Sequence, residues 1–301
     1  MKKIYLKFIS ECPIKVARGV KLSRFCTMKV GGPADLFVEA KTPSELIEVL
    51  RIAIKLGIKY FVLASGSNVV FPDAGWRGLV IHYTANSIKI ERKKMVAEVE
   101  AGAKLNYVVM HLVDLGLGGF NFLANIPGSV GGAIVGNAGC YGKEIKDFLR
   151  TIQIYNVKTN EVSTIKPKEL DFAYRHSKLK ERPELIVLSA VFKLGKINKK
   201  QALKEIAEEK QLRWRKHPHA PSCGSWFKNP ERGVPAWKFI EAAGMRGATI
   251  GGARISCKHS NFLINCGGAT ATDVAKLSLF VKRKVGSQTG INLMEEVKIV
   301  S

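Results

Sequence analysis

A run of 28 residues without a charged side chain, residues 115–142, most constrains what this chain can fold into. The run contains nine glycines, three asparagines and Pro127. A membrane helix of this composition would expose backbone groups that lipid cannot satisfy, so we expect no membrane span here. Glycine instead lets the backbone approach other groups closely and adopt positive φ angles. The run therefore predicts a close-approach loop.

Two further glycine loops flank predicted strands. Val30-Gly-Gly-Pro-Ala34 precedes one strand, and Ala64-Ser-Gly-Ser-Asn68 follows another. Successive backbone N–H groups in such loops can form a concavity that binds an anion. The chain has neither a G-x-x-x-x-G-K-[ST] motif nor a strand–G-x-G-x-x-G–helix pattern. Three glycine loops in one half of the chain predict a pyrophosphate site of another kind, although ordinary turns would also explain each loop alone.

Composition restricts the class of protein. The length of 301 residues suits about two domains, and an apolar fraction of 46% can bury a sizeable core. Lysine and arginine outnumber aspartate and glutamate by 48 to 25, which gives a formal net charge of +23. Such a balance suits an anionic partner or simply a lysine-rich surface. The basic residues are dispersed, without a long basic block interleaved with aromatic residues, so a nucleic-acid-binding protein is the weaker alternative.

The six cysteines show no zinc-site spacing, so we expect reduced thiols and no metal. They are Cys12, Cys26, Cys140, Cys223, Cys257 and Cys266. Lys7, Glu11 and Pro13 interrupt any signal-peptide core. We therefore expect a cytoplasmic protein.

Helix and strand signals are mixed without regular alternation, which predicts an α+β fold. Thr42-Pro-Ser-Glu45 is a capping box that predicts a helix over residues 42–57. It lies between predicted strands at 35–40 and 58–64, and a strand follows at 78–83. The remaining predictions are strands at 98–101, 184–194, 260–265 and 291–300, a hairpin of 148–157 with 161–165, and helices at 104–115, 198–215, 236–243 and from a Thr272 cap onward.

The stretch Pro221-Ser-Cys-Gly-Ser-Trp-Phe-Lys-Asn-Pro230 follows a polar segment at 216–224 that we interpret as a domain boundary. Ser225 could be a nucleophile, a proton donor or part of a polar turn. Cys223 with His217 or His219 could form a Cys–His nucleophile. That reading leaves the three glycine loops unexplained.

The motifs together resemble the UDP-N-acetylenolpyruvoylglucosamine reductase family (MurB). They occur in the family's order over roughly residues 20–300. They are Val30-Gly-Gly-Pro-Ala34 in the first glycine loop, Ser65-Gly-Ser-Asn68 in the second, Ile126-Pro-Gly-Ser-Val-Gly-Gly-Ala133 in the third, Asn137-Ala-Gly139, Tyr174-Arg-His-Ser177, Gly224-Ser-Trp-Phe-Lys-Asn-Pro230 and Leu293-Met-Glu-Glu-Val297. The chain is similar to the shorter form of the family, because only six residues, 178–183, separate Tyr174-Arg-His-Ser177 from the next predicted strand. Longer members insert a tyrosine-bearing segment there.

The resemblance implies an FAD-binding region of the FAD-linked oxidase type followed by an α+β substrate-binding domain. It implies subdomains at 1–83 and 84–198, a UDP-sugar domain at 199–290, and a final strand, 291–301, that returns to the FAD-binding part. It also implies the residues that contact FAD: Gly31, Gly32, Ser65, Gly66, Ser67, Asn68, Ile126, Pro127, Gly128, Ser129, Gly131, Gly132, Asn137, Ala138 and Gly139. Ala64 and Ser65 stand where the family usually carries more glycine.

The implied activity is reduction of an enolpyruvyl ether to a lactyl ether in peptidoglycan synthesis. NADPH reduces FAD, and the flavin then reduces the vinyl carbon of UDP-N-acetylglucosamine enolpyruvate. Arg175 is implied to hold the substrate carboxylate, Ser225 to protonate the adjacent carbon, and Glu296 to act beside them. Tyr174, Lys216 and Asn229 are implied substrate contacts. We further expect a monomer without nucleic-acid or membrane partners.

The main alternative is another FAD-dependent oxidase or dehydrogenase of the same superfamily. Many such enzymes tether flavin to a histidine. None of the six histidines lies in the glycine loops, which favours the reductase.

Overall fold

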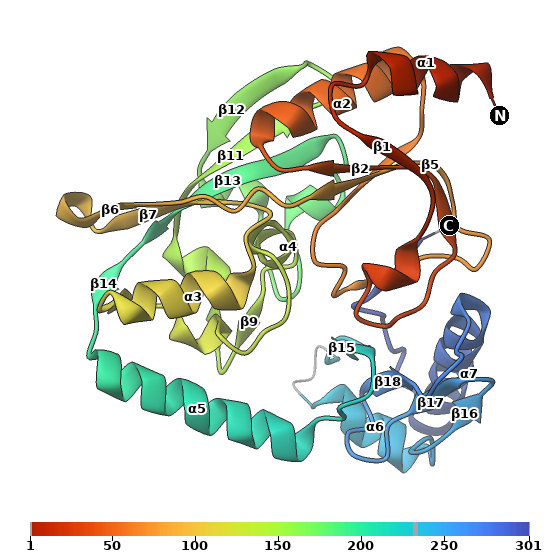
Figure 1. The fold of residues 1–301 in the computed structure, drawn as a ribbon. Helices are drawn as coiled ribbons and strands as arrows, with labels where there is room; N and C mark the ends of the chain where they lie inside the picture. The colour runs from red at the N-terminus through yellow and green to blue at the C-terminus, as the bar shows by residue number, and fades with distance from the viewer. Residues whose placement is uncertain (1, 231–233, 301) are drawn as a thin grey trace. The chain divides into compact units, whose positions relative to one another are not determined.

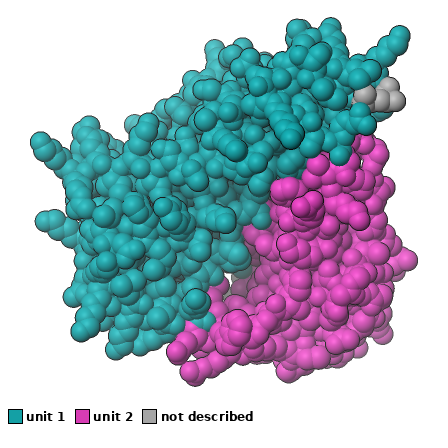
Figure 2. Space-filling model, in the orientation of Figure 1, with its two compact units in different colours: residues 1–18, 36–65, 78–210 teal, residues 19–35, 66–77, 211–301 magenta. Residues whose placement is uncertain are grey.

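The computed structural model describes residues 2–230 and 234–300, which form two compact units (Figures 1 and 2). Unit 1 comprises Met1–Arg18, Leu36–Ser65 and Gly78–Lys210. Unit 2 comprises Gly19–Asp35, Gly66–Arg77 and Gln211–Ser301. Each unit has its own apolar core. The domain boundaries inferred from the sequence, 1–83, 84–198 and 199–290, remain a prediction.

The first sheet has four strands in the order β1-β2-β5-β3. Their bounds are Val16–Lys21 (β1), Pro33–Ala40 (β2), Tyr60–Leu63 (β3) and Trp76–Tyr83 (β5). Helix α2, Pro43–Lys55, joins β2 to β3 and confirms the predicted strand–helix–strand unit. Strand β5 lies between β2 and β3 and pairs in parallel with β3. The two strands that α2 connects are therefore not neighbours in the sheet.

Helix α2 forms where its capping signal predicts it. The Thr42 hydroxyl oxygen accepts a hydrogen bond of 3.1 Å from the Glu45 amide. Gly57 adopts a φ of +64° just after the helix, a conformation that glycine adopts at little cost. The buried face consists of Leu46, Val49, Leu50 and Ala53.

A five-stranded antiparallel sheet, β12-β11-β13-β7-β6, lies in unit 1 (Figure 1). Its strands are Ile88–Glu91 (β6), Val96–Glu100 (β7), Leu149–Asn156 (β11), Glu161–Ile165 (β12) and Leu185–Lys193 (β13). The predicted hairpin is confirmed as β11–β12, with Asn160 at a φ of +58° in its turn.

The other elements of unit 1 are short, apart from three helices. The helices are α1 (Lys3–Glu11), α3 (Leu105–Asp114) and α5 (Lys199–Lys216). The last turns of α5 belong to unit 2. The sequence did not predict α1, β1 or β6. The short strands and the short α-helix are β8 (Leu117–Gly118), α4 (Val130–Val135), β9 (Gly139–Cys140), β10 (Lys143–Glu144) and β14 (Gly195–Lys196). Short 3-10 helices lie at Arg92–Lys94, Asn121–Leu123, Ile145–Phe148, Pro167–Leu170 and Lys178–Lys180.

Unit 2 contains an antiparallel sheet in the order β15-β18-β17-β16. Helices α6 (Ala236–Ala242) and α7 (Ala271–Thr289) belong to the same unit, and their apolar residues join its core. A two-stranded parallel sheet pairs β19 with β4. The strands are Val69–Val70 (β4), Ser222–Ser225 (β15), Thr249–Ile250 (β16), Ala253–Ile255 (β17), Phe262–Asn265 (β18) and Lys298–Ile299 (β19).

Two predictions in unit 2 were wrong in detail. The N-cap of α7 is Thr270, whose hydroxyl accepts from the Asp273 amide at 3.0 Å; Thr272 instead donates its amide and hydroxyl to Asp73. The predicted strand over 291–300 is reduced to Lys298–Ile299, because its partner β4 has only two residues.

Across residues 2–230 and 234–300, every helix is too short or too polar to cross a membrane.

Candidate active site

The segment Gly224–Lys228 in unit 2 is held on both sides by backbone hydrogen bonds. Gly224 adopts a φ of +79°, and Ser225 ends β15 opposite Phe262 of β18. On one side the Trp226 amide donates to the Asn261 carbonyl at 2.7 Å. On the other side the Glu296 amide donates to the Trp226 carbonyl at 2.8 Å. Ser225 and Glu296, both predicted catalytic residues, are therefore tied to the same buried residue, Trp226.

Asn261 holds this segment through its side chain as well. Its Oδ1 accepts from the Phe227 amide at 2.9 Å, and its Nδ2 donates to the Phe227 carbonyl at 2.8 Å. Asn261 is 4% exposed and Phe227 is 1% exposed, so these two bonds satisfy backbone groups that water does not reach. A further backbone hydrogen bond joins the same two segments, because the Lys228 amide donates to the Met294 carbonyl at 2.8 Å.

Glu295, the neighbour of Glu296, is held by a network of side-chain hydrogen bonds. Ser278 donates to Glu295 at 3.0 Å and Lys282 at 2.7 Å, and the indole N–H of Trp226 donates to Ser278. Burial raises the pKa of the Glu295 carboxyl, but the hydrogen bonds from Lys282, its own amide and Ser278 outweigh burial and hold the pKa below its ordinary value. Glu295 thus belongs to a structural network, and Glu296 stays the predicted functional member of the pair.

The two predicted substrate contacts in unit 2 differ in their surroundings. Asn229 Oδ1 accepts from the Ala236 amide at 3.0 Å and so caps the start of α6. Lys216 is the exposed last residue of α5.

Glycine in the first two loops is required by close backbone approaches within unit 2. A Cβ on Gly32 would lie 2.1 Å from the Asp73 carbonyl oxygen, and one on Gly66 would lie 2.0 Å from that of Phe25. The Gly32 amide already donates to Pro72. Asn68, the last residue of the second loop, donates from Nδ2 to the Glu296 carbonyl at 3.0 Å. This bond ties the second loop to the Glu296 segment.

Several amides of the third loop, in unit 1, are engaged within the protein. Residues 130–135 form α4, whose cap Ser129 accepts from the Gly132 amide at 3.2 Å. The Val130 and Gly131 amides donate to the Ala103 and Ala101 carbonyls. A Cβ on Gly131 would lie 2.9 Å from that of Ala101, so this glycine allows close packing. These bonds occupy the amides of residues 130–132, and the anion-binding role of the third loop as a whole stays a prediction.

Asn137 retains the clearest signal for a bound group. Its side chain is fully buried and its Nδ2 donates to the Ala173 carbonyl at 2.9 Å. Its Oδ1 has no hydrogen-bond partner among the described residues. A buried polar atom of this kind calls for an explanation such as a missing ligand.

Arg175 lies close to Asn137 in unit 1. Its Nη1 donates to the Gly139 carbonyl at 2.9 Å, and its guanidinium lies 5.5 Å from the centre of the Tyr174 ring. Tyr174 is 49% exposed. Unit 1 therefore brings together Asn137, Gly139, Tyr174 and Arg175.

The cysteine alternative loses support. Cys223 is buried, and burial raises the pKa of its thiol to about 12, which disfavours the nucleophilic thiolate. His217 packs against Phe262 and His219 stacks on Trp214.

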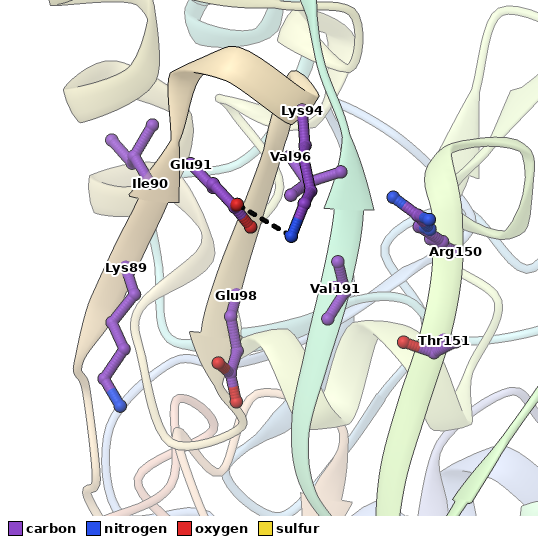
Figure 3. Close-up of a pocket in the computed structure, with 9 residues that line it drawn as sticks. All are labelled: Lys89, Ile90, Glu91, Lys94, Val96, Glu98, Arg150, Thr151 and Val191. Carbon is purple, nitrogen blue, oxygen red and sulfur yellow. Dashed lines mark ion pairs between the residues drawn. The ribbon is translucent and has the colours of Figure 1, made fainter.

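A separate hollow lies on the five-stranded sheet of unit 1 (Figure 3). Its lining residues come from β6, β7, β11 and β13 and from the β6–β7 turn, where Glu91 and Lys94 form an ion pair of 2.8 Å. The lining is Lys89, Ile90, Glu91, Lys94, Val96, Glu98, Arg150, Thr151 and Val191, none of which is a predicted site residue.

Sequence reasoning missed two residues that organise these segments, Asn261 and Lys180. The ammonium group of Lys180 donates to the Arg175 carbonyl at 2.8 Å. A single asparagine or lysine carries no periodic signal, so only the tertiary contacts could identify them.

Comparison with known proteins defines the class first. Residues 34–164 match an FAD binding domain, so the chain is an FAD-binding protein, and the buried, unpartnered Asn137 oxygen fits such a cofactor. Residues 216–300 match the C-terminal domain of UDP-N-acetylenolpyruvoylglucosamine reductase.

The relatives then define the family. Reductases of that name from Caldanaerobacter subterraneus subsp. tengcongensis and Pelobacter propionicus are 39% and 41% identical over 93% of this chain, covering 91% and 93% of their own lengths. The crystal structure of the Thermus caldophilus enzyme (MurB) superposes with a TM-score of 0.81 at 33% identity, over 96% of this chain and 100% of that one. The chain belongs to the UDP-N-acetylenolpyruvoylglucosamine reductase family.

Proposed function

We propose that this protein is an NADPH-dependent reductase that converts UDP-N-acetylglucosamine enolpyruvate to UDP-N-acetylmuramate in peptidoglycan synthesis. Similarity to reductases of this name over 93% of the chain supports the proposal. The structural observation that carries it is the backbone hydrogen bond from the Glu296 amide to the carbonyl of Trp226, the residue that follows Ser225. FAD, when bound, supplies the hydride chemistry.

We assign the cofactor to the two predicted subdomains, 1–83 and 84–198, with the three glycine loops as its contacts. The match of residues 34–164 to an FAD binding domain supports this assignment. Residues 199–290 would bind the UDP-sugar, through Lys216 and Asn229. A lysine can serve as a point charge for a diphosphate.

Reduction of the vinyl carbon leaves negative charge on the carbon next to the carboxylate. Arg175 can hold that carboxylate through two parallel charge-assisted hydrogen bonds, and Tyr174 would contact the substrate beside it. The Ser225 hydroxyl gives its proton to the adjacent carbon and regains one from solvent. A hydroxyl is a weak acid, but a carbanion is a strong enough base to take its proton if the two are well placed. Glu296 would act beside Ser225.

An absorbance experiment tests the proposal. The purified protein should absorb as a flavoprotein, lose that absorbance with NADPH, and regain it when the enolpyruvyl UDP-sugar is added. Denaturation should release the flavin, which separates this protein from oxidases with covalent flavin. A protein that is bleached by NADPH but never reoxidised by the substrate would contradict the proposed substrate.

The Ser225→Ala variant tests the role of the serine. We expect NADPH to bleach the flavin at the wild-type rate and the substrate-dependent return of absorbance to slow by about 10²–10⁴-fold, the range for a lost general acid. Ser222→Ala, in the same strand, is the matched control. If bleaching by NADPH is also lost, Ser225 does not act in substrate reduction alone.

A further inference from the structure

Arg175 has an unusual backbone conformation. Its φ is +54°, in the left-handed region that residues other than glycine adopt uncommonly. It lies in a tight turn closed by hydrogen bonds in both directions between Ala173 and His176, of 3.1 and 3.0 Å. Such a conformation persists only where the surroundings hold it.

Three hydrogen bonds tie this turn to the glycine-rich run. Ser177 Oγ donates to the Val135 carbonyl at 2.8 Å, Asn137 Nδ2 donates to the Ala173 carbonyl at 2.9 Å, and Arg175 Nη1 donates to the Gly139 carbonyl at 2.9 Å. The run thus holds the residues around Arg175 and one end of its guanidinium.

The peptide group of Arg175 is held by a different element. Lys180, at the end of the short 3-10 helix Lys178–Lys180 (η6), donates from Nζ to the Arg175 carbonyl at 2.8 Å. A hydrogen bond from an ammonium group is stronger than one between neutral partners. Because the bond acts on the carbonyl of Arg175 itself, it bears directly on the backbone angles that set the direction of the side chain.

We propose that Lys180 is a positioning residue for Arg175. Its ammonium group keeps the Arg175 peptide in the left-handed conformation from which the guanidinium reaches the substrate carboxylate. The inference rests on the proposed role of Arg175 in substrate binding. Displacement of a substrate-positioning group by about 1 Å can cost about 10²-fold in rate.

Lys180→Met tests the proposal, because Lys180 is exposed and methionine keeps an apolar stem. We expect substrate-dependent reoxidation of the reduced flavin to slow about tenfold, the equivalent of about 1.4 kcal/mol in the barrier. Bleaching by NADPH and the melting temperature should not change. Lys180→Arg, which keeps a charged donor, should restore most of the rate.

Lys178→Met is the matched control. Lys178 lies in the same short helix but pairs with Asp171 at 3.3 Å, so its loss should leave the reoxidation rate unchanged. A Lys180→Met variant as fast as wild type, or a Lys178→Met variant equally slow, would overturn the proposal.

A double-mutant cycle separates positioning from a general structural effect. In an Arg175→Ala background Lys180→Met should slow reoxidation no further, because no guanidinium remains to be positioned. An equal slowing in both backgrounds would refute the proposal.

Failure of the proposed function would be recognised separately, because the wild-type protein would then not be reoxidised by the enolpyruvyl UDP-sugar. In that case a crystal structure of Lys180→Met decides the positioning role. Departure of Arg175 from its left-handed φ or loss of its bond to Gly139 would support that role, and an unchanged turn would reject it.

Discussion

Asn261→Ala should destabilise unit 2 strongly. The side chain of Asn261 makes both hydrogen bonds that satisfy the backbone of Phe227, at 2.9 and 2.8 Å. Alanine removes both partners while Phe227 remains buried at 1% exposure. Each buried group left without a partner costs about 1–3 kcal/mol, so the substitution should lower the free energy of unfolding by about 2–6 kcal/mol. That loss is a large part of the about 5–15 kcal/mol that stabilises a typical domain.

Urea unfolding followed by tryptophan fluorescence measures this loss selectively. The four tryptophans, Trp76, Trp214, Trp226 and Trp237, all belong to unit 2. Asn292→Ala, at an exposed position of the same unit, is the control and should change the unfolding free energy by less than about 0.5 kcal/mol. If Asn261→Ala changes it no more than this control does, the hydrogen bonds of Asn261 do not hold the Ser225 segment as we argue.

Two further predictions concern stability. Thr270→Ala removes the N-cap of α7, whose hydroxyl accepts from the Asp273 amide, and should cost about 1 kcal/mol in urea unfolding; no loss would show that the cap is replaceable. Burial, together with the positive charges nearby, lowers the pKa of His217 from 6.5 to about 4. Since the unfolded chain then binds a proton that the folded protein excludes, stability is complete above about pH 6.5 and falls as the pH drops towards 4. His217→Gln should flatten the dependence of the melting temperature on pH in that window, and an unchanged profile would contradict the assignment.

Local signals predicted the elements whose determinants lie within a few residues. The capping box that begins at Thr42 and the glycine at position 57 both lie at the ends of α2. The helix was therefore predicted close to its bounds, Pro43–Lys55. The hairpin around Asn160 is equally local. The ordered motifs were also enough to predict the reductase family and its FAD-binding domain.

The errors arose where the partner is remote in sequence. Thr270 and Thr272 are both capable caps, and the choice depends on Asp73, which takes the amide and hydroxyl of Thr272 from 199 residues away. The apolar residues of 291–300 were read as a long strand, but a strand extends only as far as its partner, and β4 has two residues.

The sequence by itself determined the position of α2 and of the β11–β12 hairpin, the family and the identities of the candidate site residues, because these depend on short motifs and their order. Only the tertiary structure decided what the glycines of the third loop do. The first two amides of the short helix at 130–135 donate to the Ala103 and Ala101 carbonyls, which come from an earlier part of the chain. It also decided which of Glu295 and Glu296 is engaged by Lys282 and that Lys180 supports the peptide of Arg175. Those outcomes depend on distances between groups remote in sequence, which no local pattern contains.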